Sequence, residues 1–296
     1  MMRVLVYAQK LKEVDFHIIK HFFDLLAEYD FKIGVNTVLG DLLKDQNIGV
    51  NEEGFDKVVN TKELIAFAPD ILITLGGDGT ILSAISLIRD TGIPIMGINL
   101  GRLGFLASVE KTKIELAIKA VAKHKFILEK RTLLKIDCDT PIFGDMPFAL
   151  NDFTIHKRDT SSMITIHTYV DGQYLNSYWA DGIIVATPTG STGYSMSCGG
   201  PIVFPGSGNL VITPVAPHSL NVRPLVISDT REISFQVEGR GENFLCTLDS
   251  RYETITHDDR IKLSRCDFHI NLVMLESMDF MNTIRTKLMW GLDKRN

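Results

Sequence analysis

The first third of the chain alternates between short apolar runs and segments with helical periodicity. The apolar runs, which predict buried strands, are residues 3–8, 71–75 and 93–98. The segments whose apolar side chains recur at helical spacing are residues 14–29, 81–88 and 114–121. Strands that alternate with helices predict a mainly parallel sheet covered by helices on both faces.

The pattern changes near Phe126, after which strand-like segments dominate. These segments are residues 126–137, 148–156, 163–170, 182–187, 225–228, 232–237, 244–248, 260–263 and 268–275. Ile284 and Leu288 then indicate a last helix. The sequence therefore predicts an α/β protein with a parallel-sheet domain over residues 1–125, a β-rich, sandwich-like second domain over 126–275, and a C-terminal helix over 276–296.

Composition and charge narrow the class of protein. The 296 residues are 45 % hydrophobic and 23 % charged, which excludes a disordered or fibrous chain. The net charge of −5 disfavours partners such as duplex DNA or an acidic membrane, so we expect neither. The four cysteines form no Cys-x-x-Cys pair, and no apolar run is long enough for a signal peptide or a membrane span. We expect a cytoplasmic protein without disulfides.

A glycine-rich turn at residues 76–80, Gly-Gly-Asp-Gly-Thr, lies between a predicted strand and a predicted helix. Glycines allow close backbone approach, and a helix N-terminus favours phosphate, so the turn predicts a nucleotide-binding first domain. Asp78 is a carboxylate placed to accept a proton from an attacking hydroxyl, which indicates phosphoryl transfer to an alcohol. In the alternative interpretation, Asp78 merely caps the helix. The chain has no Gly-Lys dipeptide for a Walker A loop and no Gly-x-Gly-x-x-Gly after a strand.

A second glycine-rich stretch runs from Asp181 to Pro201 and is dense in hydroxyl side chains. A strand, a Pro-Thr-Gly turn and a short helix beside Tyr194 would suit a nucleoside. Ser191 does not lie in a Gly-x-Ser-x-Gly elbow, so we do not interpret it as a nucleophile. Asn151 and Asp152, at a predicted strand end, suit hydrogen bonds to ribose hydroxyls or to the adenine edge, or they simply terminate the strand.

Taken together, these motifs resemble the NAD kinase family, whose members phosphorylate the 2′-hydroxyl of the adenosine ribose of NAD. The resemblance rests on blocks that keep the family's order over most of residues 70–275, and these blocks are residues 76–80, 97–99, 103–106, 151–152, 181–201 and 265–269. The block at 181–201 is the specific one, because lipid kinases and phosphofructokinases carry similar Gly-Gly-Asp-Gly turns. A lipid or sugar kinase of the same superfamily, and a dinucleotide-binding sensor without catalysis, stay open as alternatives.

The resemblance implies roles for individual residues. It makes Asp78 the catalytic base, with Gly79 beside the substrate. Residues implied to line the NAD site are Asn151, Asp152, Asp181, Thr192, Gly193, Tyr194, Ser195, Met196 and Ser197. Residues implied at less distinctive ligand-contacting positions are Ala186, Ala216 and Arg251. Two departures stand out: many family members have Glu in place of Asp152, and some have a basic residue near Trp179, where a phosphate contact would be lost.

The mechanism also implies a cofactor and partners. Turnover should need a divalent cation, with Mg²⁺ first among the candidates, because the donor's phosphate charge must be neutralised and no Walker lysine is present. We expect the nucleotide phosphates and water, rather than protein ligands, to hold this ion. The substrates would be NAD and ATP, with polyphosphate as another donor, and the family resemblance implies a homodimer or homotetramer. We expect the basic cluster formed by Lys123, Lys125, Lys130, Arg131 and Lys135 to be a solvated sheet face.

Overall fold

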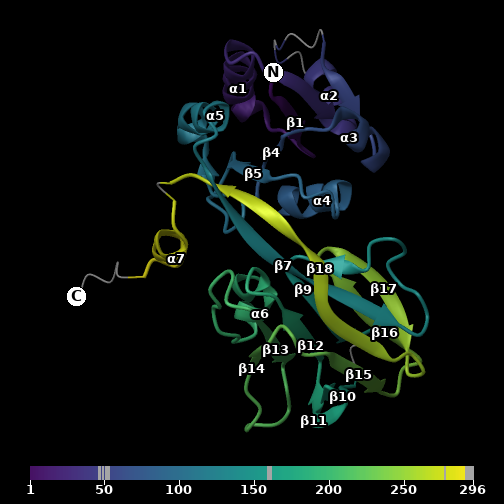
Figure 1. Ribbon diagram of the computed structural model, residues 1–296. Coiled ribbons are helices and arrows are strands. Elements are labelled where there is room, and N and C mark those ends of the chain that lie inside the picture. The colour runs from purple at the N-terminus through teal and green to yellow at the C-terminus, as the bar shows by residue number, and fades with distance from the viewer. Residues whose placement is uncertain (46–47, 49, 51–53, 159–161, 277, 291–296) are drawn as a thin grey trace. The chain divides into compact units, whose positions relative to one another are not determined.

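The computed structural model of the chain describes residues 1–296 except 46–47, 49, 51–53, 159–161, 277 and 291–296 (Figure 1). It contains two compact units. The first comprises Met1–Lys130 and the segment that begins at Ile270, and the second is Arg131–His269. Over the residues described, none of the helices has the length and apolar character needed to cross a membrane.

The first unit is built on a parallel sheet. Its strand order is β18-β5-β4-β1-β2-β3, with β6 paired to β5, and every pair is parallel. The strands are β1 (Arg3–Tyr7), β2 (Lys32–Asn36), β3 (Asp56–Val58), β4 (Ile71–Leu75), β5 (Ile95–Asn99), β6 (Val109–Glu110) and the end of β18 (Ile261–Met274). This confirms the parallel sheet predicted from the alternation of strands and helices.

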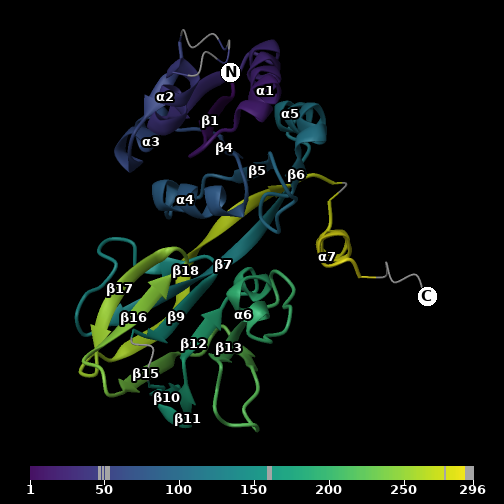
Figure 2. The same cartoon turned by 180° about the vertical axis from the view of Figure 1, so that it is seen from behind.

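Helices cover both faces of this sheet (Figures 1 and 2). Val4 and Val6 of β1 pack in one apolar cluster with residues of α1, α2 and α5, whereas Leu5, which points to the opposite face, is also fully buried. Helices α3 and α4 contact each other. The helical segments are η1 (Glu13–Asp15), α1 (Phe16–Glu28), α2 (Thr37–Asp45), α3 (Thr61–Phe67), α4 (Asp78–Ile88), η2 (Lys111–Lys113), α5 (Ile114–Ala122) and α7 (Phe280–Leu288).

The second unit is antiparallel. One sheet has the order β14-β13-β12-β9-β16-β17, and the other contains β11-β10-β15-β18 together with β7 and β8. The elements not yet given are β7 (Ile127–Cys138), β8 (Phe148–Ala149), β9 (Asp152–Lys157), β10 (Ile164–Val170), β11 (Gln173–Ala180), β12 (Gly182–Ala186), η3 (Gly190–Thr192), α6 (Tyr194–Ser197), β13 (Asn209–Val215), β14 (Leu225–Ser228), β15 (Ile233–Glu238), β16 (Asn243–Leu248) and β17 (Arg251–Thr256).

The two sheets of this unit share an apolar core, which confirms the β-rich, sandwich-like prediction. Phe153 of β9 stacks on Phe235 of β15 with ring centroids 6.0 Å apart, so the inner faces of the sheets meet there. Strand β12 is buried on both faces, because Ile183 and Val185 join this core while Ile184 and Ala186 pack in a second cluster. A strand buried on both faces explains the continuous apolar run that precedes the second glycine-rich stretch.

One pair of predicted strands was wrong. Residues 260–263 and 268–275 form parts of the single strand β18. Polar side chains at 264, 265 and 267 interrupt the apolar run, yet a strand accommodates them because alternate side chains leave the core, while Cys266 between them is buried. Strands β2, β3, β6, β11, β13 and β17 and helices α2 and α3 were not predicted.

Candidate active site

The glycine-rich turn after β4 has the backbone of an anion site. Gly76 has a φ of +154°, and a Cβ atom there would lie 2.2 Å from Thr80 Oγ1, so this position requires glycine. Gly77 is the N-cap of α4, and among the residues described no side chain caps this helix. The N–H of Thr80 donates to the carbonyl of Gly77 at 2.9 Å, which leaves the N–H groups of Asp78 and Gly79 at the start of α4 for a ligand, and the helix dipole favours a negative one.

A pocket of about 430 Å³ borders this turn, and its lining includes Gly76, Gly77, Gly79 and Thr80. Three cationic residues line the same pocket, namely Lys10, Lys12 and Arg102. Asp15, an acidic residue in its wall, is 4 % exposed and lies 3.5 Å from the ammonium group of Lys111. Cations beside an uncapped helix N-terminus suit a polyphosphate.

Asp78 is the first residue of α4, but its carboxylate turns away from the helix and binds the loop before β6. Oδ2 accepts a hydrogen bond from the N–H of Phe105 at 2.9 Å, and Oδ1 accepts from Leu106 at 3.1 Å and Ala107 at 2.8 Å. The backbone comes this close because residue 104 is glycine, where a Cβ atom would lie 1.8 Å from Asp78 Oδ1.

This geometry rejects the interpretation of Asp78 as the cap of α4, since Gly77 occupies the cap position. It also limits the carboxylate chemically. A carboxylate offers about four lone-pair sites, and three are used by the loop. One site on Oδ2 remains to accept a proton or a hydrogen bond from a substrate hydroxyl.

In the second unit, Asn151 and Asp152 are fixed by a carboxylate from the turn between β16 and β17. Asp249 accepts hydrogen bonds from the N–H groups of Leu150 at 2.9 Å, Asn151 at 2.7 Å and Asp152 at 3.3 Å. Asp152 itself is 7 % exposed, and burial together with the Asp249 charge raises the pKa of Asp152 to about 7. Burial also raises the pKa of Asp249, while the three N–H bonds and Arg251 oppose that rise.

The second glycine-rich stretch packs directly on these residues. Ala186 at the end of β12 is the register partner of Asp152, and the N–H of Thr187 donates to the carbonyl of Asn151 at 2.9 Å. A Cβ atom at Gly193 would lie 3.8 Å from Asp152 Oδ2. The structure thus brings together Asn151, Asp152, Ala186 and Gly193, four of the residues expected at one site.

Tyr194 presents an aromatic ring beside this cluster. The ring is 41 % exposed and stacks on His156, with centroids 5.5 Å apart and planes 28° apart. Burial lowers the pKa of His156, which favours the neutral imidazole in this stack, although the Asp181 charge opposes the shift. Asp181 forms an ion pair with Lys157 at 2.6 Å. An exposed tyrosine face with polar groups nearby suits a planar base.

Comparison with known proteins decides the family. A family model described as the ATP-NAD kinase N-terminal domain matches residues 8–126, and one described as the ATP-NAD kinase C-terminal domain matches residues 150–275. The chain belongs to the ATP-NAD kinase family. A relative from Cytophaga hutchinsonii called NAD kinase is 44 % identical over 98 % of this chain and 99 % of its own length.

Two solved structures share the fold of this family member. An NAD kinase from Archaeoglobus fulgidus in complex with ATP has a TM-score of 0.73 at 25 % identity, over 97 % of this chain and 99 % of that one. The yeast NADH kinase complexed with NADH has a TM-score of 0.84 at 23 % identity, over 98 % of this chain and 88 % of that one.

Several residues that the family resemblance implied are engaged inside the protein. Ser195 is fully buried, and its hydroxyl lies 2.8 Å from Thr213 Oγ1. The Thr192 hydroxyl donates to the carbonyl of Thr189 at 3.2 Å. The Arg251 guanidinium donates to the carbonyls of Met146 and Phe148. These three side chains support the site's framework in this structure.

Three further implied residues lie at the surface or near it. Met196 is half-buried and Ser197 is exposed, both on α6. Ala216 is exposed and has a φ of +45° directly after β13, where the carbonyl of Val215 accepts from the N–H of Asp181 at 3.0 Å. Trp179, where some family members are basic, is 52 % exposed and packs on the His218 ring at 4.4 Å.

For this member of the NAD kinase family, the sequence analysis missed four charged residues near the candidate site and misplaced a fifth. Asp249 and the cations Lys10, Lys12 and Arg102 were not singled out. Arg131 was expected on a solvated face, but it is 3 % exposed and donates to Thr189 Oγ1 at 3.2 Å. Arg131 and Leu133 lie two residues apart in β7 and therefore share one side of the strand, so the apolar Leu133 is the sequence signal that could have placed Arg131 inside.

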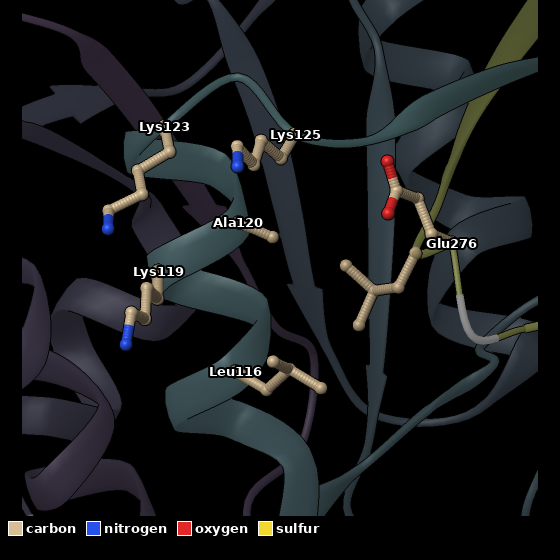
Figure 3. A pocket seen from close by; sticks show the side chains of 7 residues that line it. Leu116, Lys119, Ala120, Lys123, Lys125 and Glu276 are labelled. Atoms are coloured by element: carbon tan, nitrogen blue, oxygen red, sulfur yellow. The ribbon is translucent and has the colours of Figure 1, made fainter.

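A second pocket, of about 310 Å³, lies beside α5, and its lining includes Leu116, Lys119, Lys123, Lys125 and Glu276 (Figure 3). Lys123 and Lys125 belong to the basic cluster expected at the surface, and both are exposed. In Figure 3 the ammonium groups of Lys119 and Lys123 point away from Glu276, so the charges do not converge. None of the expected site residues lines this pocket.

Proposed function

We propose that this chain transfers the terminal phosphoryl group of ATP to the 2′-hydroxyl of the adenosine ribose of NAD, giving NADP and ADP. Membership of the ATP-NAD kinase family supports the substrates and the reaction class. The observation that carries the chemistry is the Asp78 carboxylate. It is held by three backbone N–H groups with one lone-pair site left, in the turn that borders the basic pocket.

The proposed step balances as a displacement at phosphorus. The 2′-oxygen forms a bond to the γ-phosphorus, the bond from that phosphorus to the bridging oxygen breaks, and ADP leaves. The proton of the hydroxyl passes to the free site on Asp78 Oδ2. A positioned base of this kind contributes about 10²–10⁴-fold to the rate.

For the donor, we assign the basic pocket to the phosphates. The N–H groups at the start of α4 and the side chains of Lys10, Lys12 and Arg102 supply the positive potential that a Walker lysine supplies elsewhere. Their role is to hold the phosphates and to lower the cost of moving negative charge onto the leaving ADP.

For NAD, we assign recognition to the second unit. The Asn151 amide and the Asp152 carboxyl group are placed by Asp249 and suit the ribose hydroxyls or the adenine edge. The exposed face of Tyr194 suits stacking on a base. Asp152 is one methylene shorter than the Glu of many relatives, which shortens the reach of this carboxyl group by about one bond.

We further propose a divalent cation, Mg²⁺, as cofactor. Among the described residues there is no group of three or more His, Cys, Asp or Glu side chains suited to a metal, and the pocket beside the turn is lined by cations. This arrangement fits an ion that arrives on the nucleotide and is held by phosphate oxygens and water rather than by protein side chains. Such an ion would neutralise phosphate charge. Thermal unfolding with ATP, with and without Mg²⁺, tests this independently of turnover, because the ion should raise the unfolding temperature only when ATP is present.

Three finer proposals concern the range of phosphoryl donors, the location of the protein in the cell and its oligomeric state. Polyphosphate is a second donor, because the basic pocket recognises phosphate charge. The protein acts in the cytoplasm, which its four free thiols suit. It assembles as a homodimer or homotetramer, and light scattering on the purified protein measures this.

The decisive experiment incubates purified protein with ATP and Mg²⁺ and with NAD, NADH or diacylglycerol, and identifies the product. Formation of NADP, detected with an NADP-dependent dehydrogenase, is expected. Phosphorylation of diacylglycerol with none of NAD would instead favour a lipid kinase, and binding of NAD without any product would favour a sensor.

A further inference from the structure

The C-terminal helix α7 packs on the loop that binds Asp78. The helix begins after Asp279, whose side chain accepts a hydrogen bond from the N–H of Asn282 and so caps it. Ile284 anchors the helix and is 6 % exposed. All of these residues belong to the first unit, as do Asp78 and its loop.

Two residues of α7, Phe280 and Lys287, contact the ring of Phe105. The Phe280 ring lies against it with centroids 6.3 Å apart, and the ammonium group of Lys287 lies 4.4 Å from its centroid. Phe280 and Lys287 are two helical turns apart and therefore share one face of α7. A cation at this distance over an aromatic face is attracted by the ring, so Lys287 adds a directional contact to the apolar one.

The backbone of the same Phe105 reaches the catalytic carboxylate. Its N–H donates to Asp78 Oδ2, the oxygen that keeps a free lone-pair site. Any movement of Phe105 therefore changes the direction in which that site points. The half-buried ring of Phe105 contacts α7, and the backbone N–H of the same residue binds Asp78. Contacts with α7 therefore restrain the position of this N–H relative to the carboxylate.

We propose that Lys287, through the ring of Phe105, is a positioning residue for Asp78, and that α7 is thereby part of the catalytic apparatus. The proposal rests on the proposed function, because it assumes that Asp78 accepts the proton. In the competing account, α7 merely covers the apolar surface around Ile284, and Lys287 is a solvated surface charge.

The test compares Lys287→Met with Arg285→Met. Both substitutions remove one positive charge from the last turn of α7, but Arg285 is exposed and only Lys287 lies over Phe105. We expect Lys287→Met to lower kcat about two- to fivefold, the effect of losing a partly exposed cation–π contact, with both KM values unchanged. Arg285→Met should match wild type, and Lys287→Arg should restore kcat.

A readout independent of turnover is amide hydrogen exchange at Phe105, Leu106 and Ala107, whose N–H groups bind Asp78. These amides should exchange faster in Lys287→Met than in Arg285→Met. In a Phe105→Leu background, Lys287→Met should have no further effect on kcat, because the ring that couples them is gone.

The outcomes separate cleanly. Equal kcat and equal exchange in Lys287→Met and Arg285→Met would overturn the proposal, and so would faster exchange with unchanged kcat. A wild-type protein that does not phosphorylate NAD would overturn the proposed function, and the catalytic part of this inference with it. The exchange comparison would then still show whether α7 holds the loop.

Discussion

Replacing Asp78 by Asn separates the loop contact of this side chain from the catalytic task proposed for it. The substitution keeps the size of the side chain and one acceptor oxygen but removes the charge and the proton acceptor. If the amide oxygen takes the place of Oδ1, the bonds from Leu106 and Ala107 survive, while the new NH₂ group faces the N–H of Phe105. One charge-assisted hydrogen bond is lost, which costs about 1.5–3 kcal/mol of unfolding free energy.

In the proposed mechanism, loss of the base is the larger effect of this substitution on turnover. We expect kcat of Asp78→Asn to fall about 10²–10⁴-fold, which corresponds to about 3–5 kcal/mol of barrier. NAD affinity should hold or improve, because a negative charge near phosphates has been removed. Urea unfolding, calorimetric NAD binding and steady-state kinetics on this variant measure the three quantities.

Because the bond from Phe105 is lost in the same variant, a drop in stability does not by itself identify a base. Gly104→Ala is the matched control, since its Cβ atom would lie 1.8 Å from Asp78 Oδ1 and would push the loop away while leaving the carboxylate in place. We expect Gly104→Ala to lose stability but to keep at least tenfold more kcat than Asp78→Asn. Equal losses of kcat in the two variants would show that Asp78 acts only by holding the loop.

Three further predictions concern the other charged groups. Asp249→Asn should raise KM for NAD about tenfold and lower the unfolding free energy by about 1–3 kcal/mol, because three N–H groups lose their anion. Asp258→Asn, in an exposed turn, is the control, and equal KM values for NAD in the two variants would contradict the assignment. The folded-state pKa of Asp152 is raised from 3.8 to about 7, so wild-type stability should fall by at most about 4 kcal/mol as pH rises between those values and then level off. Asp152→Asn should lack that slope in urea unfolding at several pH values, and an unchanged slope would refute its origin in Asp152. Single Lys10→Met, Lys12→Met and Arg102→Met substitutions should each raise KM for ATP about threefold to tenfold without changing KM for NAD, whereas Lys119→Met in the other pocket should leave both unchanged.

The features predicted from the sequence involve residues that are adjacent along the chain. The features that were missed involve residues far apart in the sequence. The turn at 76–80 was predictable because its strand, glycines and helix are adjacent in the sequence, and Gly76 alone accounts for its unusual φ. The partners of Asp78 lie 27 to 29 residues away in a loop with no periodicity. Asp249 lies 97 to 99 residues from the amides it binds, in a turn between two strands of which the second was not predicted. An acidic residue in a turn is ordinary in a sequence, and only the sheet register shows what it binds.

The two aspartates also explain why phosphate recognition was hard to locate from motifs. Consecutive backbone N–H groups form a concave site for anions. In this chain, the N–H groups of residues 105–107 and of residues 150–152 form two such sites, and each is already filled by a carboxylate of the protein, Asp78 or Asp249. Neither loop therefore offers its N–H groups to a phosphate. We have proposed for that task the uncapped start of α4 together with Lys10, Lys12 and Arg102, which come from two other segments of the chain and form no motif of their own. The filled sites instead fix backbone next to Asp78 and Asn151, so that the groups proposed to meet the substrate are held by charge-assisted hydrogen bonds rather than by loop packing.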